Sequence, residues 1–421
     1  MRYVSDWPAW RLGRQPVSAE KGPIRWPEVR VLEDVAYGQR ATPTRIFAIL
    51  LPVYRVTIKA TITDGEPYAL IDRYLERAMA EADLHTPADL ARFFGLDEVV
   101  TERALRFLAA IGHVTIRDEQ VALTELGYRS VRDEVRYVVT RQDRRVLYFD
   151  AFGSRPLPQR YYDTRNVALL TSVALATAVG AREWPRFTTL FSRLGLRPEA
   201  LAELARRADR AGFNFPDRID DPEPLEAPEC VFLPIYLVRA VEPGNRVRLF
   251  AYTQATEVAA ADLDVTDLCE RTAEVAAVVE AEQRDSAPAS RRKLSAWLER
   301  RTGDASGLQQ LDNGAWQVTL PSSIFGGNAA LGLSTVGSFV PLNQDILHIW
   351  CEDVEVRRHA LLERIDNYLS HRARPGRAGT EERVTRIADQ LDLGTTDLPT
   401  LRRQAVEAGR TSLAAHLDTL M

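Results

Sequence analysis

The sequence predicts a multidomain protein of the α+β class. The chain has 421 residues, 45% of them hydrophobic, which is enough for two or three domains that each have a core. Segments with the apolar period of helices follow segments with the two-residue alternation of strands. Stretches rich in proline and glycine separate them, which indicates several modules joined by loops.

The beginning of the chain predicts an N-terminal arm followed by a strand. Residues 1–50 are rich in proline and tryptophan and contain one strand-like run, VRVLEDVAY, at 29–37. Residues 45–62 alternate apolar and polar side chains in their second half, as a half-buried strand does. The apolar run at 47–51 also suits a helix, so both interpretations of that run stay open.

Three helix-like segments come next. The first starts near Tyr68, and apolar residues at helical spacing predict its buried face: Leu70, Ile71, Tyr74, Leu75 and Met79. The second runs from an N-cap at Thr86 to a C-terminal glycine at Gly95, and Asp97 caps the third. The predicted inward stripe of the third helix is Val100, Ala104, Phe107, Leu108 and Ile111. Phe94 and Leu105 are also expected to be buried.

A short pair of strands follows these helices. Residues 113–124 alternate around a polar turn at Asp118-Glu119, which predicts a two-stranded wing. Three helices followed by a wing, within residues 51–135, are the element order of a winged helix-turn-helix domain. The segment resembles the winged-helix superfamily, and this resemblance implies a fold but no single function.

Residues 136–165 form the most basic region of the sequence. They predict a β-hairpin turning near Gln142-Asp143 and then a proline-bounded loop. Seven arginines against three aspartates give this region a net charge of +4. Cations beside tyrosines suit phosphate contact and base stacking, so the candidate nucleic-acid-binding residues are Arg136, Arg141, Arg144 and Arg145. The alternative is that these arginines form an ordinary solvated strand face.

The helical unit before it is acidic. Residues 66–134 contain eight arginines and fourteen acidic residues, a net charge of −6. The outward positions of the third helix are predicted to be Glu98, Glu102, Arg106 and Ala109, of which Arg106 alone suits a phosphate or a guanine. A DNA reader usually neutralises several phosphates. This balance favours contact with protein, with DNA contact through the neighbouring arginines or a purely structural role as the alternatives.

The remaining chain predicts mixed modules. Residues 166–285 combine helices with a strand pair at 230–254, and residues 291–372 predict an α/β C-terminal domain. Residues 381–421 predict a helical tail.

No segment predicts a cofactor or a metal ion. GNAALGLS, at 327–334, has the glycine and serine spacing of a phosphate loop but carries Leu333 in place of its lysine. Six histidines and three cysteines show no spacing typical of metal ligands. With no signal-peptide pattern and no run of about 20 apolar residues, we expect a cytoplasmic protein without a membrane partner.

The winged-helix-like segment is followed by RRVLYFDAFGSRPLP, at 144–158, and by long mixed segments. This arrangement resembles large bacterial accessory proteins of DNA-metabolism and phage-defence loci. The resemblance implies a non-enzymatic subunit or adaptor of a nucleic-acid-processing assembly, with other protein subunits as partners and DNA as a second partner. Two other interpretations stay open: a winged-helix transcriptional regulator with a C-terminal sensing or oligomerisation region, which would act as a homo-oligomer, and a nuclease-like enzyme with an acidic site.

Overall fold

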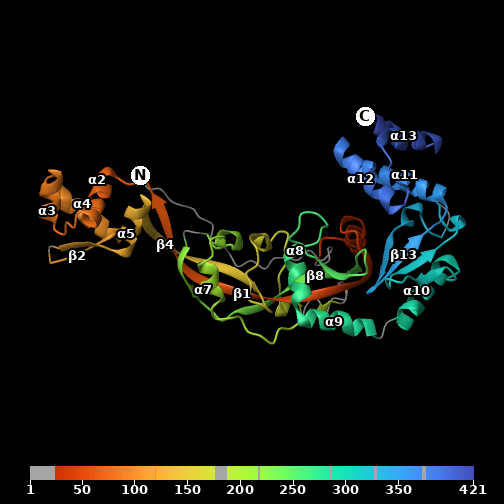
Figure 1. Ribbon diagram of the computed structural model, residues 1–421, viewed down its shortest axis with the longest axis horizontal. Coiled ribbons are helices and arrows are strands. Elements are labelled where there is room, and N and C mark those ends of the chain that lie inside the picture. Colours follow the sequence, from red (N-terminus) through yellow and green to blue (C-terminus); the bar gives the residue numbers. More distant parts are fainter. Residues whose placement is uncertain are drawn as a thin grey trace. The chain divides into compact units, whose positions relative to one another are not determined.

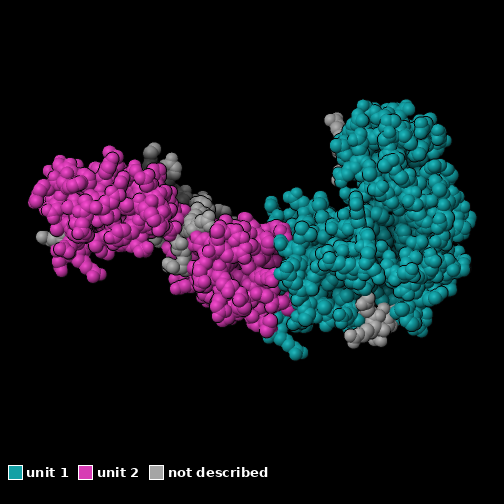
Figure 2. Space-filling model, viewed as in Figure 1, with its two compact units in different colours: residues 1–52, 163–193, 231–421 teal, residues 53–162, 194–230 magenta. Residues whose placement is uncertain are grey.

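The protein has a mixed α+β fold that divides into two compact units (Figure 2). The computed structural model describes residues 24–118, 120–175, 187–216, 219–284, 287–326, 330–371 and 376–421. Unit 1 comprises residues 1–52, 163–193 and 231–421, and unit 2 comprises residues 53–162 and 194–230. The expected strand at 45–62 is confirmed as the long strand β1 (Thr42–Glu66), which contributes residues to both units.

Unit 1 contains a mixed sheet built on the first part of β1. There β1 neighbours β13 (Asp345–Trp350) antiparallel, β6 (Thr188–Thr189) parallel, and β8 (Glu229–Val241). The predicted strand pair at 230–254 is confirmed, because β8 pairs antiparallel with β9 (Val247–Tyr252). The remaining strands of the unit are β5 (Leu170–Thr171), β10 (Leu308–Gln310), β11 (Trp316–Thr319) and β12 (Phe339–Leu342).

Most helices of this unit come after β9, toward the C-terminal end of the chain (Figure 1). They are α8 (Leu263–Arg271), α9 (Ala273–Arg284), α10 (Ala287–Thr302), α11 (Val354–His371), α12 (Arg377–Gln390), α13 (Leu398–Glu407) and α14 (Thr411–Asp418). The last three, α12 to α14, confirm the helical tail predicted at 381–421. They share one apolar core with β11 and β13, in which Leu347, Ile365 and Leu401 are fully buried. None of the described helices is both long and apolar enough to cross a lipid bilayer.

The strand-like run at 29–37 is helical, so that prediction is wrong. Residues 28–33 form α1 (Glu28–Glu33), which continues as a turn of π-helix, η1 (Asp34–Gly38). The helix places Val31, Leu32 and Val35 on one face, where all three are buried in a core with side chains of β8 and β9. A strand would send Val31 and Leu32 to opposite faces, so burial of both favours the helix.

Unit 2 contains the second part of β1 and its partners. This part pairs antiparallel with β4 (Arg136–Asp150) and with β7 (Ile219–Pro224), and α7 (Ala200–Ala205) packs on the same core. The predicted hairpin turn at Gln142-Asp143 is wrong, because both residues lie inside β4, opposite Thr61 and Ala60 of β1. The ladder partner of β4 is a strand some 80 residues earlier, which local turn chemistry does not reveal.

A helical module is inserted between β1 and β4, whose facing ends pair at Glu66 and Arg136. We call residues 70–133 the α2–α5 module (Figure 1). It contains α2 (Leu70–Glu81), α3 (Pro87–Phe94), α4 (Glu98–Ala110), β2 (Val114–Arg117), β3 (Gln120–Leu123) and α5 (Glu125–Asp133). Its core includes Leu75, Leu90, Leu105 and Leu108. β2 pairs antiparallel with β3, and Asp118 of the expected turn follows β2, while residue 119 lies outside the described residues.

Candidate functional site

The caps expected from the sequence define where α3 and α4 begin. The Thr86 hydroxyl accepts a hydrogen bond from the Asp89 amide at 3.1 Å, and the Asp97 carboxylate accepts one from the Val99 amide at 2.8 Å. Gly95 ends α3 in the left-handed region, at a φ of 64°. These three local signals fix the two helices against each other.

The face that α2 buries differs from the predicted one. Leu75 and Met79 are buried as expected, but Leu70, Ile71 and Tyr74 are exposed. Two acidic side chains of α2, Asp72 and Glu76, are buried in their place. Partners from outside the helix, described below, compensate these charges, so the rotation of α2 is set by polar contacts that an apolar count does not include.

The same kind of difference occurs on α4. Its buried residues are Thr101, Leu105 and Leu108, while Val100 and Phe107, which were predicted to face inward, are exposed. Glu98, Glu102 and Arg106 are exposed, as predicted. The expected burial is therefore confirmed for Leu75, Leu105 and Leu108, whereas Phe94 and Ile111 are only partly buried.

Large apolar side chains consequently gather on the outside of one small module. We call the following set the exposed apolar surface: Leu70, Ile71 and Tyr74 of α2, Phe93 of α3, and Val99, Val100 and Phe107 of α4. Val99 is 69% exposed and Phe93 61%. Aromatic contacts connect α2 to α3, because the ring of Phe94 lies 6.3 Å from that of Tyr74 and 4.9 Å from that of Phe93. Sequence periodicity had assigned most of this surface to the core.

A buried polar cluster joins the module to β4. Nδ1 of His113 lies 2.5 Å from a Glu76 carboxylate oxygen, and its Nε2 contacts the carbonyl oxygen of Tyr137. The Tyr68 hydroxyl donates to the other Glu76 oxygen at 2.5 Å. Burial alone would lower the pKa of His113, but the hydrogen bonds to Glu76 and to the Tyr137 carbonyl raise it above its ordinary value. Each ring nitrogen of His113 thus lies against an acceptor oxygen, an arrangement that favours the protonated ring.

Arg136 belongs to this cluster rather than to an open basic face. Its guanidinium bonds Glu66 at 2.6 Å and Asp72 at 3.3 Å, and it lies 5.4 Å from the centre of the Phe107 ring. Only 17% of its side chain is exposed. Arg136 thus holds the first residue of β4 against β1 and α2, and a phosphate would have to displace two carboxylates from it.

Arg144 and Arg145, two of the other candidate arginines, lie farther along β4. Arg144 and Arg145 are neighbours on β4, so strand alternation sends them to opposite faces of the ladder. Arg144 is opposite Lys59, and Arg145 reaches the Asn214 side chain at 3.5 Å. Arg141 is opposite Ile62 on the same strand, and its side chain lies outside the described part of the structure. Arg106 is exposed on α4.

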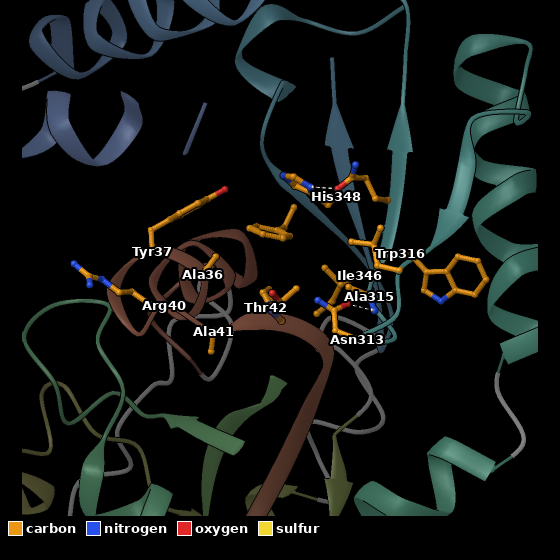
Figure 3. A pocket seen from close by; sticks show the side chains of 14 residues that line it. Ala36, Tyr37, Arg40, Ala41, Thr42, Asn313, Ala315, Trp316, Ile346 and His348 are labelled. Atoms are coloured by element: carbon orange, nitrogen blue, oxygen red, sulfur yellow. Dashed lines mark hydrogen bonds between the residues drawn. The ribbon is translucent and has the colours of Figure 1, made fainter. Parts of the chain in front are cut away.

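A hollow in unit 1 presents different chemistry (Figure 3). Its volume is about 370 Å³, and its walls include Tyr37 from η1 with Trp316, Phe339 and His348 from the strands. Burial, with the nearby charge of Arg364, lowers the pKa of His348 to about 4. The imidazole is therefore neutral; it stacks on Phe339 at 4.9 Å, and its Nδ1 lies 3.2 Å from the Gln317 amide oxygen. The residues that line this hollow include no carboxylate and no cysteine to pair with it.

Comparison of the chain with family models, with curated proteins and with solved structures finds no match. Within the described ranges, no three histidine, cysteine or acidic side chains are grouped so as to hold a metal ion. In the segment that resembles a phosphate loop, Gly327 lies outside the described residues, and Gly332 leads into a short 3₁₀ turn at Leu333–Thr335. The exposed apolar surface is therefore the feature from which a function can be argued.

Proposed function

We propose that the α2–α5 module is a winged helix-turn-helix domain that binds another protein through its exposed apolar surface. The chain would act as a non-enzymatic adaptor subunit of a nucleic-acid-processing assembly. The order of three helices followed by a two-stranded sheet supports the domain type. The resemblance to accessory proteins of DNA-metabolism and phage-defence loci supports the assembly.

The exposed apolar surface carries this proposal. Large apolar patches on a soluble module are typical of interaction sites, because burying them against a partner removes them from water. Seven large apolar side chains on three short helices are exposed here, including Val99 and Phe107 of α4. A DNA duplex offers phosphates and base edges, which need cations and hydrogen-bonding side chains. An apolar protein surface complements this set of side chains better.

Charge supports the same choice. The module and its flanks, residues 66–134, have a net charge of −6, which repels a polyphosphate at long range. On α4 itself, Glu98 and Glu102 are exposed beside Arg103 and Arg106, so this face has no net positive charge. The partner should therefore present apolar side chains surrounded by basic ones.

Site-specific photocrosslinking tests the proposal. A photoreactive residue would replace Val99 in the full chain, produced in its native host, and a matched chain would carry it at Val406, which is 54% exposed on α13. We expect position 99, and not position 406, to give one discrete adduct with a second protein. An adduct with DNA at position 99 would favour the transcriptional regulator over the adaptor. An adduct between two copies of this chain would identify the surface as a dimer interface.

The regulator has one observation in its favour, the exposure of Arg103 and Arg106 together on α4. Fluorescence anisotropy on duplex DNA at several salt concentrations would test it with Arg106→Ala and with Arg144→Ala/Arg145→Ala. If DNA binds through the β4 arginines, the double variant should weaken binding to every sequence and flatten the salt dependence, by roughly one unit of slope for each lost contact. Loss of sequence preference in Arg106→Ala alone would instead identify α4 as a reading helix.

A further inference from the structure

Unit 1 contains a second, larger pocket, which we call the arginine pocket. Its volume is about 1130 Å³, and its walls come from α1 and η1, from the loop before α8, and from α11 and α12. Five arginines line it: Arg25, Arg30, Arg364, Arg383 and Arg386. Ser334, the last residue of the segment that resembles a phosphate loop, also lines it. None of these residues belongs to the exposed apolar surface.

Two of these arginines have acidic partners on their own helices. Arg30 bonds Glu33 at 2.9 Å, and Arg386 bonds Glu382 at 3.0 Å. A third acid of the pocket, Asp34, accepts hydrogen bonds from the Tyr252 hydroxyl at 2.7 Å and from the Gln39 amide. These three carboxylates are therefore engaged by groups other than Arg364 and Arg383. A fourth acid, Glu257, also lines the pocket.

Arg364 and Arg383 are half-buried, whereas the other three arginines of the pocket are exposed, and among the described residues neither of the two forms an ion pair. Arg364 donates to the backbone oxygens of Ser334 and Val336 and, at 2.8 Å, to the Gln390 side chain, all of which are neutral. Arg383 lies 5.9 Å from the centre of the Tyr368 ring. Its Nε is buried without a hydrogen-bond acceptor among the described residues. Buried cations without such partners are costly unless an anion joins them.

The local electrostatics agree with this geometry. Burial lowers the pKa of Arg383, and the positive charges of Arg30, Arg386 and Arg364 lower it further, with Glu33 opposing them. Burial likewise lowers the pKa of Arg364. Glu33 and Glu363 oppose this shift at Arg364. The lining residues of the pocket comprise five arginines and four acids, so the arginines are in excess by one. Arginine forks match phosphate oxygens in geometry and charge, which makes phosphate the anion that this group suits best.

Aromatic side chains lie beside these cations. Trp26 and Tyr368 both line the pocket, and the Arg25 guanidinium lies 4.9 Å from the centre of the Trp26 ring. The indole N–H of Trp26 is buried and finds no acceptor among the described residues. A planar base can stack on such rings and accept such a hydrogen bond, which an inorganic anion cannot do in full.

We infer that the arginine pocket binds a free nucleotide, with its phosphate groups bonded by Arg383 within the charge of Arg30, Arg364 and Arg386, and with its base against Trp26. The pocket volume of about 1130 Å³ slightly exceeds the usual range for small-molecule sites, which leaves room for a base, a sugar and phosphates. This site is independent of the proposed protein contact, since it lies in unit 1 and uses other residues.

Isothermal titration calorimetry on the full chain tests the inference with ATP, AMP, tripolyphosphate and adenosine. We expect saturable binding of ATP, weaker binding of tripolyphosphate and no binding of adenosine, because charge contributes most and the base adds to it. Arg383→Gln should weaken ATP binding roughly tenfold or more, as expected for loss of a charge-assisted contact. Arg377→Gln is the matched control, because Arg377 is on the same helix, exposed and paired with Glu381.

A second variant separates the base from the phosphates. Trp26→Leu should weaken binding of ATP while leaving that of tripolyphosphate unchanged, and thermal melting would confirm that both variants are folded. Absence of saturable nucleotide binding, or equal ATP affinity in Arg383→Gln and the parent chain, would overturn the site. If Trp26→Leu and the parent chain bind ATP with equal affinity, the base makes no contact with Trp26. The pocket would then be an anion site and not a nucleotide site.

Discussion

The α2 polar cluster, formed by Tyr68, Asp72, Glu76, His113 and Arg136, and the arginine pocket both take charged side chains out of water, but they treat those charges differently. In the cluster every charge has a partner of opposite sign: His113 contacts Glu76, and Arg136 bonds Asp72. In the arginine pocket, Arg364 and Arg383 form no ion pair among the described residues. The first arrangement is complete within the chain, and the second has capacity for an anion from outside.

This difference separates structural charges from candidate binding charges. A paired buried charge holds two elements in register, here α2 and β4, and removing one member leaves the other uncompensated. A buried cation that forms no ion pair is not compensated in this way, and taking it out of water is costly. The two regions should therefore respond with opposite signs when one charge is removed, and four predictions follow from that contrast.

The largest effect is expected for His113→Ala. This change leaves the Glu76 carboxylate buried without its cation, which should cost about 3–5 kcal/mol of the module's stability. Hydrogen exchange of the amides in residues 70–133 measures it as a fall in the opening free energy of that module. His416→Ala, at an exposed histidine of α14, should leave those amides unchanged. If the amides of residues 70–133 are as well protected in His113→Ala as in the parent chain, the α2 polar cluster does not stabilise the module.

The pH dependence should differ in sign between the two units. The folded pKa of His113 is raised above its unfolded value of about 6.5, so its contribution to unit 2 is complete below that pH and is lost as pH rises through the folded pKa. His348 in unit 1 has a folded pKa lowered to about 4, so its contribution is present above about pH 6.5 and is lost as pH falls toward 4.

Hydrogen exchange at several pH values, corrected for the intrinsic rate, tests both trends in one sample. We expect protection of residues 70–133 to weaken on the alkaline side and protection of β13 and its neighbours to weaken on the acid side. Besides Glu76, the groups that face His113 are Tyr68, Asp72 and Arg136, and their titration would add to the first trend. Parallel trends in both units would show that the two histidines do not control them.

Local signals in the sequence predicted the helices of the α2–α5 module but not which faces they bury. Thr86 and Asp97 cap α3 and α4 through neighbouring amides, so a short stretch of sequence contains the whole interaction. The orientation of α2 depends on His113, 37 residues away, and on Arg136, 64 residues from Asp72. An apolar count therefore assigned Tyr74 to the core. The sequence contained two signals for these polar contacts. One is a histidine just after the third predicted helix, and the other is a pair of acidic residues four positions apart on α2.

Non-local pairing explains the other differences. A polar Gln142-Asp143 pair resembles a turn, yet β1 supplies the hydrogen bonds that keep β4 continuous there. The arginine pocket combines Arg30 with Arg383, which are more than 350 positions apart in the printed sequence. No motif spans such a separation, so this pocket could be recognised only after the elements were placed together.

A smaller effect, opposite in sign to that of His113→Ala, is expected for Arg383→Met. Methionine keeps most of the apolar stem while removing a cation that repels Arg30, Arg364 and Arg386. The thermal midpoint of unit 1 should therefore stay unchanged or rise in the absence of nucleotide. The stabilisation that ATP gives to the parent chain should be lost in the variant. If the thermal midpoint of Arg383→Met falls clearly in the absence of nucleotide, the charge of Arg383 stabilises the fold and does not serve binding.

The smallest effect on stability, and the most specific effect on function, is expected for Val99→Asp. Val99 is 69% exposed in the first turn of α4, two residues after the Asp97 cap, so the change removes little packing and places a negative charge where the helix dipole favours one. Stability should therefore stay within about 0.5 kcal/mol of the parent chain.

Binding of the protein partner identified by crosslinking should nevertheless weaken in Val99→Asp, because a carboxylate would be buried against an apolar contact without a counter-charge. Val406→Asp, at another exposed valine, which lies in unit 1, should bind the partner normally. Retained partner binding in Val99→Asp, measured with pure components, would mean that α4 does not make the contact. A large loss of stability would instead mean that Val99 packs within the chain. Val99 would then not belong to the exposed apolar surface, and the proposed protein contact would lose its support on α4.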